Sequence, residues 1–229
     1  MDFRSSIRNT SPIVTNLIII NSLVFFAQMA FGGVEDNSKI TEWFALHHYK
    51  SKAFQPYQLV THMFMHDQQT FWHLFGNMFA LWMFGGLMEK LWGPKRFLSF
   101  YMICGLVAGL AQMGSYAYTY WVYDHSILSP EVYSWYQNQL LGNATVGASG
   151  AIMGILVAYG YTFPNTQLFI MPIPFPIKAK WAITGVLLVD IIFGILANDN
   201  IAHFAHLGGA LAGFLIVLYW NRNNRQQFF

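Results

Sequence analysis

Six long apolar stretches with few charged residues constrain the fold of this chain more than any other feature. They cover residues 13–31, 72–91, 95–115, 147–163, 179–197 and 201–220. A helix needs roughly 20 residues to cross the hydrocarbon core of a bilayer, which is about 30 Å thick. Only 10% of the 229 residues are charged, against about 25% in a soluble domain. We therefore predict an all-α polytopic membrane protein, a bundle of six transmembrane helices forming one domain over residues 1–229.

The basic residues predict how the bundle is oriented. An even number of spans places both termini on the same side, and short cytoplasmic loops are enriched in Lys and Arg. Three basic residues, Lys39, Lys50 and Lys52, fall on one side, and the other nine fall on the side of the termini. We expect both termini to be cytoplasmic. The compact chain shows no transit peptide, which favours a bacterial inner membrane, and the first stretch is too long for a signal peptide.

The loops between the stretches fall into two kinds. Residues 32–71 and 116–146 are long and rich in Trp and Tyr, side chains that favour the membrane interface, so we expect short interfacial helices in these outer loops. The inner loop, residues 164–180, contains four prolines and should not be helical. The small net charge of +2, with no basic run, predicts membrane lipid and no nucleic acid as a partner.

The predicted topology places four polar residues at a similar depth in the membrane. Ser149 is the third residue of the fourth stretch, and His206 lies about a turn and a half into the sixth. His73 lies at the outer end of the second stretch, with Asn77 about 6 Å deeper. The fourth stretch is short, so the loop before Ser149 should dip into the membrane, where irregular backbone must be buried in protein or face a water-filled cavity.

These residue types predict acyl-transfer chemistry. Ser149 is the candidate nucleophile and His206 the candidate base, because a serine hydroxyl is weak until a base takes its proton. The backbone N–H groups of Ser149 and Gly150, at a helix N-terminus, lack intrahelical acceptors and can stabilise an oxyanion. His73 and Asn77 share a helix face and are candidates for completing this oxyanion hole.

Small residues explain how the fourth and sixth stretches could approach each other. Gly150 and Gly154 form a stripe on the fourth stretch, and Gly209 and Gly213 form another on the sixth. Such stripes let membrane helices pack closely. The same pattern leaves an alternative open, because Ser149 could be only a small packing residue.

Other polar residues have competing interpretations. His203 lies one turn before His206 and is the alternative base. His62, His66 and His73 could bind a metal, but they lack the acidic base of a zinc-protease motif, so we predict no metal site. Asp190 lies deep in the fifth stretch, where an acid is a functional hypothesis by default. We favour structural hydrogen bonding for it, with orientation of the active site as the alternative.

Three motifs resemble those of a known family. Gly147-Ala148-Ser149-Gly150, His73-Leu74-Phe75-Gly76-Asn77 and Ala205-His206-Leu207-Gly208-Gly209, on these spans, resemble the rhomboid intramembrane serine proteases. The resemblance covers nearly the whole chain. It implies a Ser149–His206 dyad without a third acidic member, an oxyanion hole that includes His73 and Asn77, and no metal or other cofactor. It also implies transmembrane protein substrates that unwind near the outer face, admitted by movement of the fifth span and residues 198–200.

Two departures from the family pattern matter. Tyr57-Gln58 stands where the family often has Trp-Arg, which calls one loop-anchoring interaction into question. Met153 replaces a tyrosine that, in some members, stacks on the catalytic histidine; a thioether can also pack there. We expect activity to survive both. A catalytically silent protein that binds client membrane helices is the alternative function, whereas a transporter should show internal symmetry, which the sequence lacks.

Overall fold

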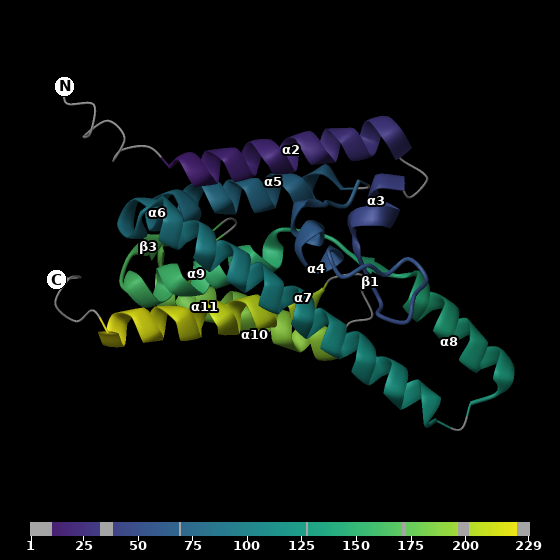
Figure 1. The fold of residues 1–229 in the computed structure, drawn as a ribbon. Coiled ribbons are helices and arrows are strands. Elements are labelled where there is room, and N and C mark those ends of the chain that lie inside the picture. The colour runs from purple at the N-terminus through teal and green to yellow at the C-terminus, as the bar shows by residue number, and fades with distance from the viewer. Residues whose placement is uncertain are drawn as a thin grey trace.

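Helices occupy all six of the apolar stretches. The computed structural model describes residues 11–32, 39–68, 70–126, 128–170, 173–196 and 202–223 (Figure 1). Among these described residues, three helices are long and apolar enough to cross a membrane: Pro12–Phe31, Pro94–Asp124 and His203–Arg222. The elements on the six stretches are α2 (Pro12–Gly32), α5 (Phe71–Ala80) with its continuations η2 (Leu81–Gly85) and α6 (Gly86–Trp92), α7 (Pro94–Asp124), α9 (Ser149–Thr162), α10 (Ala179–Leu196) and α11 (His203–Asn223).

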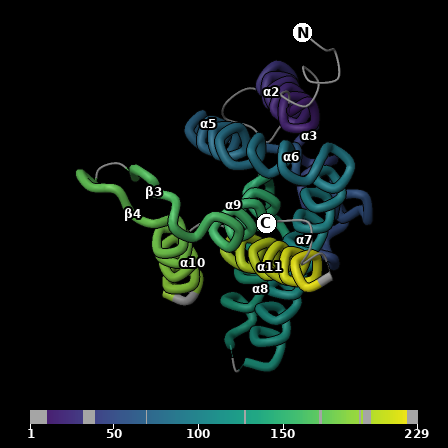
Figure 2. The backbone as a smooth tube through the Cα atoms, turned by 90° about the vertical axis from the view of Figure 1, so that its left-hand side faces the viewer, coloured from purple at the N-terminus to yellow at the C-terminus, as the bar shows by residue number. Residues whose placement is uncertain are grey.

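The centre of the bundle is α9. Seen from its end in Figure 2, it lies among α5–α6, α7, α10 and α11, with α2 outside α5 and α6. The two glycine stripes are in direct contact. A Cβ at Gly209 would overlap the carbonyl oxygen of Gly150, and one at Gly213 would lie 2.6 Å from the carbonyl oxygen of Gly154. Backbones this close exclude any larger residue, so α9 and α11 pack as the small-residue pattern predicts.

The third apolar helix is longer than expected. We predicted a span over residues 95–115, but α7 continues to Asp124. No Gly or Pro interrupts the sequence after Gly114 until Pro130, so nothing ends the helix at the membrane surface. Its 31 residues extend about 46 Å, well beyond the hydrocarbon thickness.

The extra turns of α7 form a helical hairpin with α8 (Pro130–Gly142), which projects from the bundle in Figure 1. The Tyr123 and Tyr136 rings stack with their centroids 4.1 Å apart. The Tyr133 hydroxyl donates to Asp124 at 2.8 Å. Aromatic residues of the second outer loop therefore pair two helices with each other.

The first outer loop contains the expected short helices. They are α3 (Lys39–Phe44), α4 (Gln58–Thr61) and the 3₁₀ turn η1 (His62–Phe64). Strand β1 (Leu46–His47) pairs antiparallel with β2 (Ala144–Thr145). This ladder ties the first outer loop to the segment that leads into α9.

Gln58 connects the parts of this loop. Its side chain is fully buried. The amide nitrogen donates to the carbonyls of Trp43 and Ala53 at 3.0 and 2.9 Å, and the amide oxygen accepts from the backbone N–H groups of His47 and Gln55 at 3.3 and 3.2 Å. Gln58, at a position where the resemblance leads us to expect an arginine, therefore anchors the loop through four hydrogen bonds.

The opposite end of the bundle is simpler. The described part of residues 164–178 contains no helix, as its prolines predict, and β3 (Gln167–Leu168) pairs antiparallel with β4 (Ile177–Lys178). These two ladders are the only strand pairs among the described residues. Glu89 accepts from the backbone N–H groups of Ile13 and Val14 at 2.9 and 2.8 Å, so it holds the start of α2 to α6.

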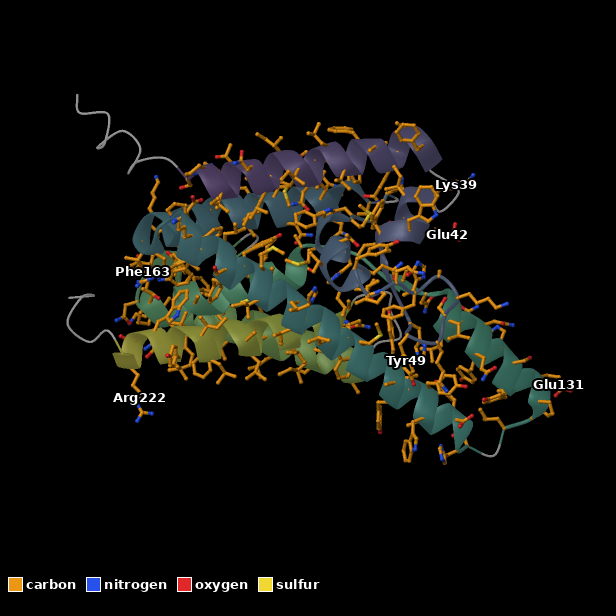
Figure 3. All side chains as sticks on the ribbon, viewed as in Figure 1. Lys39, Glu42, Tyr49, Glu131, Phe163 and Arg222 are labelled. Atoms are coloured by element: carbon orange, nitrogen blue, oxygen red, sulfur yellow. The ribbon has the colours of Figure 1, made fainter. Side chains whose placement is uncertain are left out.

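Charged and aromatic side chains mark the two ends. Figure 3 places Arg222 and Phe163 at one end of the bundle, and Lys39, Glu42, Tyr49 and Glu131 toward the other. The first described residues of α2 and the last of α11 lie at the same end (Figure 1). Arg4, Arg8 and Arg225, used above to predict the orientation, lie outside the described residues, as do residues 198–200.

Candidate active site

Ser149 begins helix α9 directly after an irregular, buried segment. Gly147 has φ = +128°, a conformation that side-chain-bearing residues rarely adopt, and its N–H donates to the His62 carbonyl at 3.0 Å. Ala148 is fully buried. We predicted Ser149 as the third residue of a span starting at Gly147, but the turn at Gly147 delays the helix until Ser149. The 14 residues of α9 extend only about 21 Å.

His206 lies in the first turn of α11 and faces Ser149. Its Nε2 is 2.7 Å from the Ser149 Oγ. The helix begins at His203; residue 201, where we predicted the sixth span to begin, lies outside the described residues. The sequence left His203 open as the alternative base, and the structure brings His206, not His203, to Ser149. The pair is within hydrogen-bonding distance without any rearrangement.

Asp190, on α10, lies on the far side of His206 from Ser149. Its Oδ1 accepts from His206 Nδ1 at 3.0 Å and from His203 Nδ1 at 2.7 Å. The residue is 7% exposed. The Ser149–His206 pair of the implied dyad is in contact, and a buried carboxylate that the resemblance left outside the dyad contacts the same histidine. The sequence signal was a deep intramembrane acid, but nothing in it identified the partner.

His73 also lies beside the serine. A Cβ built on Gly147 would be 3.2 Å from His73 Nε2 and 3.4 Å from the Ser149 Oγ, so the imidazole and the hydroxyl line the same small space. Asn77 is buried on the same helix, and its amide donates to the His73 carbonyl at 3.0 Å. The structure thus brings His73 to Ser149, while the Asn77 amide is engaged with its own helix.

The helix N-terminus supplies further donors. The first intrahelical bond of α9 runs from the Ile152 N–H to the Ala148 carbonyl, at 3.0 Å. The N–H groups of Ser149 and Gly150 precede it and have no acceptor within the helix. These are the two backbone donors expected from the sequence, and they lie next to the hydroxyl.

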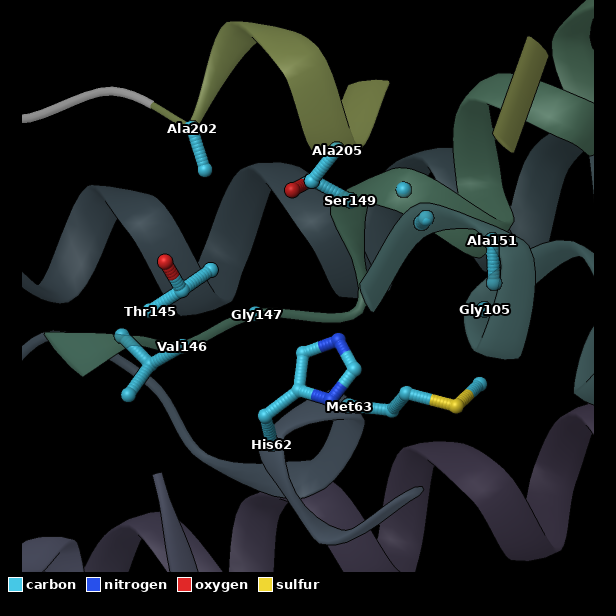
Figure 4. A pocket seen from close by; sticks show the side chains of 12 residues that line it. His62, Met63, Gly105, Thr145, Val146, Gly147, Ser149, Ala151, Ala202 and Ala205 are labelled. Carbon is cyan, nitrogen blue, oxygen red and sulfur yellow. The ribbon is translucent and has the colours of Figure 1, made fainter. Parts of the chain in front are cut away.

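A small cavity adjoins the serine. Figure 4 shows it between Ser149, Gly147, Thr145 and His62. Its volume is about 10 Å³, close to the minimum that one water molecule requires. Polar groups on two of its walls, the Thr145 and Ser149 hydroxyls, suit a water, so the site can hold solvent next to the hydroxyl inside the bundle.

The remaining histidines do not form the metal group considered above. His62 Nδ1 contacts the Gln58 carbonyl at 2.9 Å. The His66 ring is buried 5.3 Å from the His73 ring. Among the described residues, the one group that brings three possible ligand atoms together is Asp190, His203 and His206, within 4.8 Å of one another. The two Nδ1–Oδ1 hydrogen bonds account for that proximity.

Fold and site together define a helical integral membrane protein with a serine–histidine pair held inside the bundle. The chain belongs to the rhomboid family, because the rhomboid domain matches residues 53–223. It is 28% identical over 169 residues to the yeast (Saccharomyces cerevisiae) protein "Rhomboid protein 1, mitochondrial", covering 70% of this chain and 41% of that protein. It is 27% identical to Rhomboid protease GluP of Bacillus subtilis, covering 90% of this chain and 34% of that protein.

A third relative matches more of its own length. Rhomboid protease AarA of Providencia stuartii is 27% identical over 210 residues, which cover 88% of this chain and 70% of that protein. The chain therefore spans less than half of the yeast and Bacillus relatives, and most of the Providencia one. The relatives include bacterial proteins named rhomboid proteases, and the resemblance seen in the three motifs is confirmed as family membership.

Proposed function

We propose that the protein is a serine endopeptidase that cleaves peptide bonds in or near the transmembrane segments of other membrane proteins. The observation that carries this proposal is the 2.7 Å contact between Ser149 Oγ and His206 Nε2, inside a helical membrane bundle. A serine kept only for packing would not need an imidazole within hydrogen-bonding distance. The names of two bacterial relatives, both rhomboid proteases, support the same activity.

The chemistry follows from the atoms present. Ser149 Oγ attacks the peptide carbonyl carbon while its proton passes to His206 Nε2. The backbone N–H groups of Ser149 and Gly150, with His73 and Asn77, stabilise the oxyanion. His206 then donates the proton to the leaving amine, and water hydrolyses the acyl-enzyme with His206 again as the base. This mechanism uses no metal and no other cofactor.

The substrate must present an extended segment to Ser149. In a helix, the peptide carbonyl is hidden by its own hydrogen bond and by neighbouring side chains. Substrates that unwind readily near the outer face are therefore favoured, and the family resemblance further implies a small residue before the scissile bond. By analogy with the family, movement of α10 admits them.

The topology proposed with this function has six spans and both termini on the cytoplasmic side, in a single domain. The six helical stretches and the basic residues near Lys95 and Lys180 support it. A bacterial inner membrane is the proposed location. The two bacterial relatives cover 88% and 90% of this chain, against 70% for the yeast mitochondrial one.

Labelling with a serine-reactive fluorophosphonate tests the activity. The purified protein in detergent or lipid should be labelled, and should cleave single-span substrates; Ser149→Ala and His206→Ala should abolish both. Ser99→Ala and His125→Ala, at exposed positions, are the matched controls and should behave as wild type. A folded wild-type protein that neither labels nor cleaves would instead favour the silent, client-binding alternative.

A further inference from the structure

We propose that Asp190 is a positioning residue that orients His206, so that the reaction uses a Ser149–His206–Asp190 triad and not a dyad. This inference rests on the proposed function. Asp190 Oδ1 is 3.0 Å from His206 Nδ1, and the opposite ring nitrogen is 2.7 Å from Ser149 Oγ. The three side chains come from three helices, α9, α10 and α11, and form one continuous chain of hydrogen bonds.

The carboxylate determines where His206 carries its proton. A neutral imidazole has one N–H, on either Nδ1 or Nε2. Because an ionised carboxylate can only accept, a hydrogen bond to Asp190 requires that proton on Nδ1. The lone pair of Nε2 then faces the Ser149 hydroxyl, which is the tautomer that a general base needs. Without Asp190, no described contact selects this tautomer over the other.

His203 holds the carboxylate in place. Its Nδ1 donates to the same Oδ1 at 2.7 Å, and the side chains of His203 and Asp190 are each 8% exposed. An unpaired charge at such burial would be costly. Two imidazole donors converging on Oδ1 offset part of that cost and fix the direction in which the carboxylate points, while Oδ2 is buried without a hydrogen-bond partner among the described residues. His203, whose Nδ1 is bonded to Asp190, thus supports the base indirectly.

The proton balance needs no further reactant. When Ser149 Oγ bonds to the peptide carbonyl carbon, its proton moves to His206 Nε2 and the carbonyl π electrons move to the oxyanion. The imidazolium keeps its Nδ1 proton and is stabilised by Asp190, which stays ionised throughout. Collapse of the tetrahedral intermediate then transfers the Nε2 proton to the leaving nitrogen.

Asp190→Asn provides the first test, because it keeps the size of the side chain. The asparagine amide can donate to Nδ1 and hold the proton on Nε2, the wrong tautomer. We expect kcat to fall by about 10²–10⁴-fold, as loss of the carboxylate does in other triads, with KM nearly unchanged. Fluorophosphonate labelling should slow in parallel. Asp124→Asn, at an exposed acid of the α7–α8 hairpin, is the matched control and should keep full activity.

Chemical rescue distinguishes positioning from folding. Asp190→Ala leaves space for a small carboxylate, so sodium formate should raise its rate at least several-fold, whereas sodium chloride at equal ionic strength should not. Ser149→Ala should not respond. If the Asp190 variants lower only the melting temperature and leave kcat within a factor of three, or if formate has no effect on folded Asp190→Ala, the inference is overturned.

Two further outcomes distinguish this inference from the proposed function and from a metal site. If wild-type protein is neither labelled nor active, the proposed function fails; if wild type is active and Asp190→Asn equally so, only the triad fails. Chelator should leave wild-type activity unchanged. Activity lost on chelation and restored by zinc would show that Asp190, His203 and His206 hold a metal, and would overturn the hydrogen-bonding role.

Discussion

Gly209 lies against the carbonyl oxygen of Gly150, so closely that a Cβ would overlap it. Gly150 directly follows Ser149, and Gly209 is three residues after His206. The contact between these two backbones therefore fixes the separation of the helices that carry the serine and the histidine. The packing of α9 against α11 therefore also determines the distance between Ser149 and His206.

Gly209→Ala should test this coupling. The added methyl group must push α11 from α9, which we expect to cost at least about 1–3 kcal/mol of stability, as overpacking does elsewhere, and to separate His206 from Ser149. The melting temperature and the rate of fluorophosphonate labelling should both fall. Gly114→Ala is the matched control, because its Cβ would meet nothing within 4 Å; a Gly209→Ala protein that labels as fast as the control would contradict the prediction.

His73→Ala should lower kcat more than KM. The imidazole lies beside the Ser149 hydroxyl, where loss of one oxyanion donor costs about 10²–10³-fold in other enzymes. Steady-state cleavage of a single-span substrate measures both constants. Asn77→Ala should have the smaller effect, because the Asn77 amide already donates to the His73 carbonyl. An Asn77→Ala loss larger than that of His73→Ala would assign the leading role to Asn77.

Gln58→Ala should loosen the first outer loop. The substitution leaves the backbone partners of four hydrogen bonds unpaired, and each buried, unpaired group costs about 1–3 kcal/mol. Hydrogen exchange should speed up at the N–H groups of His47 and Gln55. Gln139→Ala, at an exposed position on α8, should leave those rates unchanged, and unchanged rates in Gln58→Ala would show that the loop is held by other contacts.

His66 should make the protein sensitive to acid. Burial, and then the neighbouring His73, lower the pKa of His66 to about 3. Below the ordinary pKa of about 6.5, the unfolded chain binds a proton that the folded chain does not, so stability should fall as the pH drops from 6.5 toward 3. Burial lowers the pKa of His62 to about 4, in the same direction.

Melting temperatures measured across this range check the prediction. His66→Phe removes the titrating group while keeping an aromatic ring, and should therefore lose less stability between pH 6.5 and 4 than wild type. His125→Phe, at an exposed position, should keep the wild-type slope. Parallel curves for wild type and His66→Phe would mean that another group dominates.

Local patterns in the sequence predicted much of this structure. Apolar length located the six helical stretches, since hydrophobicity is a property of each segment alone. The serine and histidine were found because each stands in a short motif. The end of α7 was not predicted, because its last turns contact α8 and the length of an apolar stretch gives no information about such a contact.

The roles of Asp190 and Gln58 depend on longer-range geometry. The partners of Asp190 lie 13 and 16 residues away on another helix, and no residue pattern encodes which face of α10 meets them. Gln58 bonds to backbone atoms, whose positions depend on the path of the whole loop. Glu89 likewise accepts from the N–H groups that begin α2, and no pattern in the sequence identifies these donors.

Asp190 belongs to α10, and an apolar groove of about 500 Å³ is lined by residues of α9, α10 and α11. Any outward displacement of α10 would therefore carry the carboxylate away from His206. The same motion that made room beside the serine would leave its base without an orienting partner. Opening of the bundle and activation of the serine would then exclude each other. Water that enters while α10 is displaced would meet a Ser149 hydroxyl whose proton no oriented base accepts.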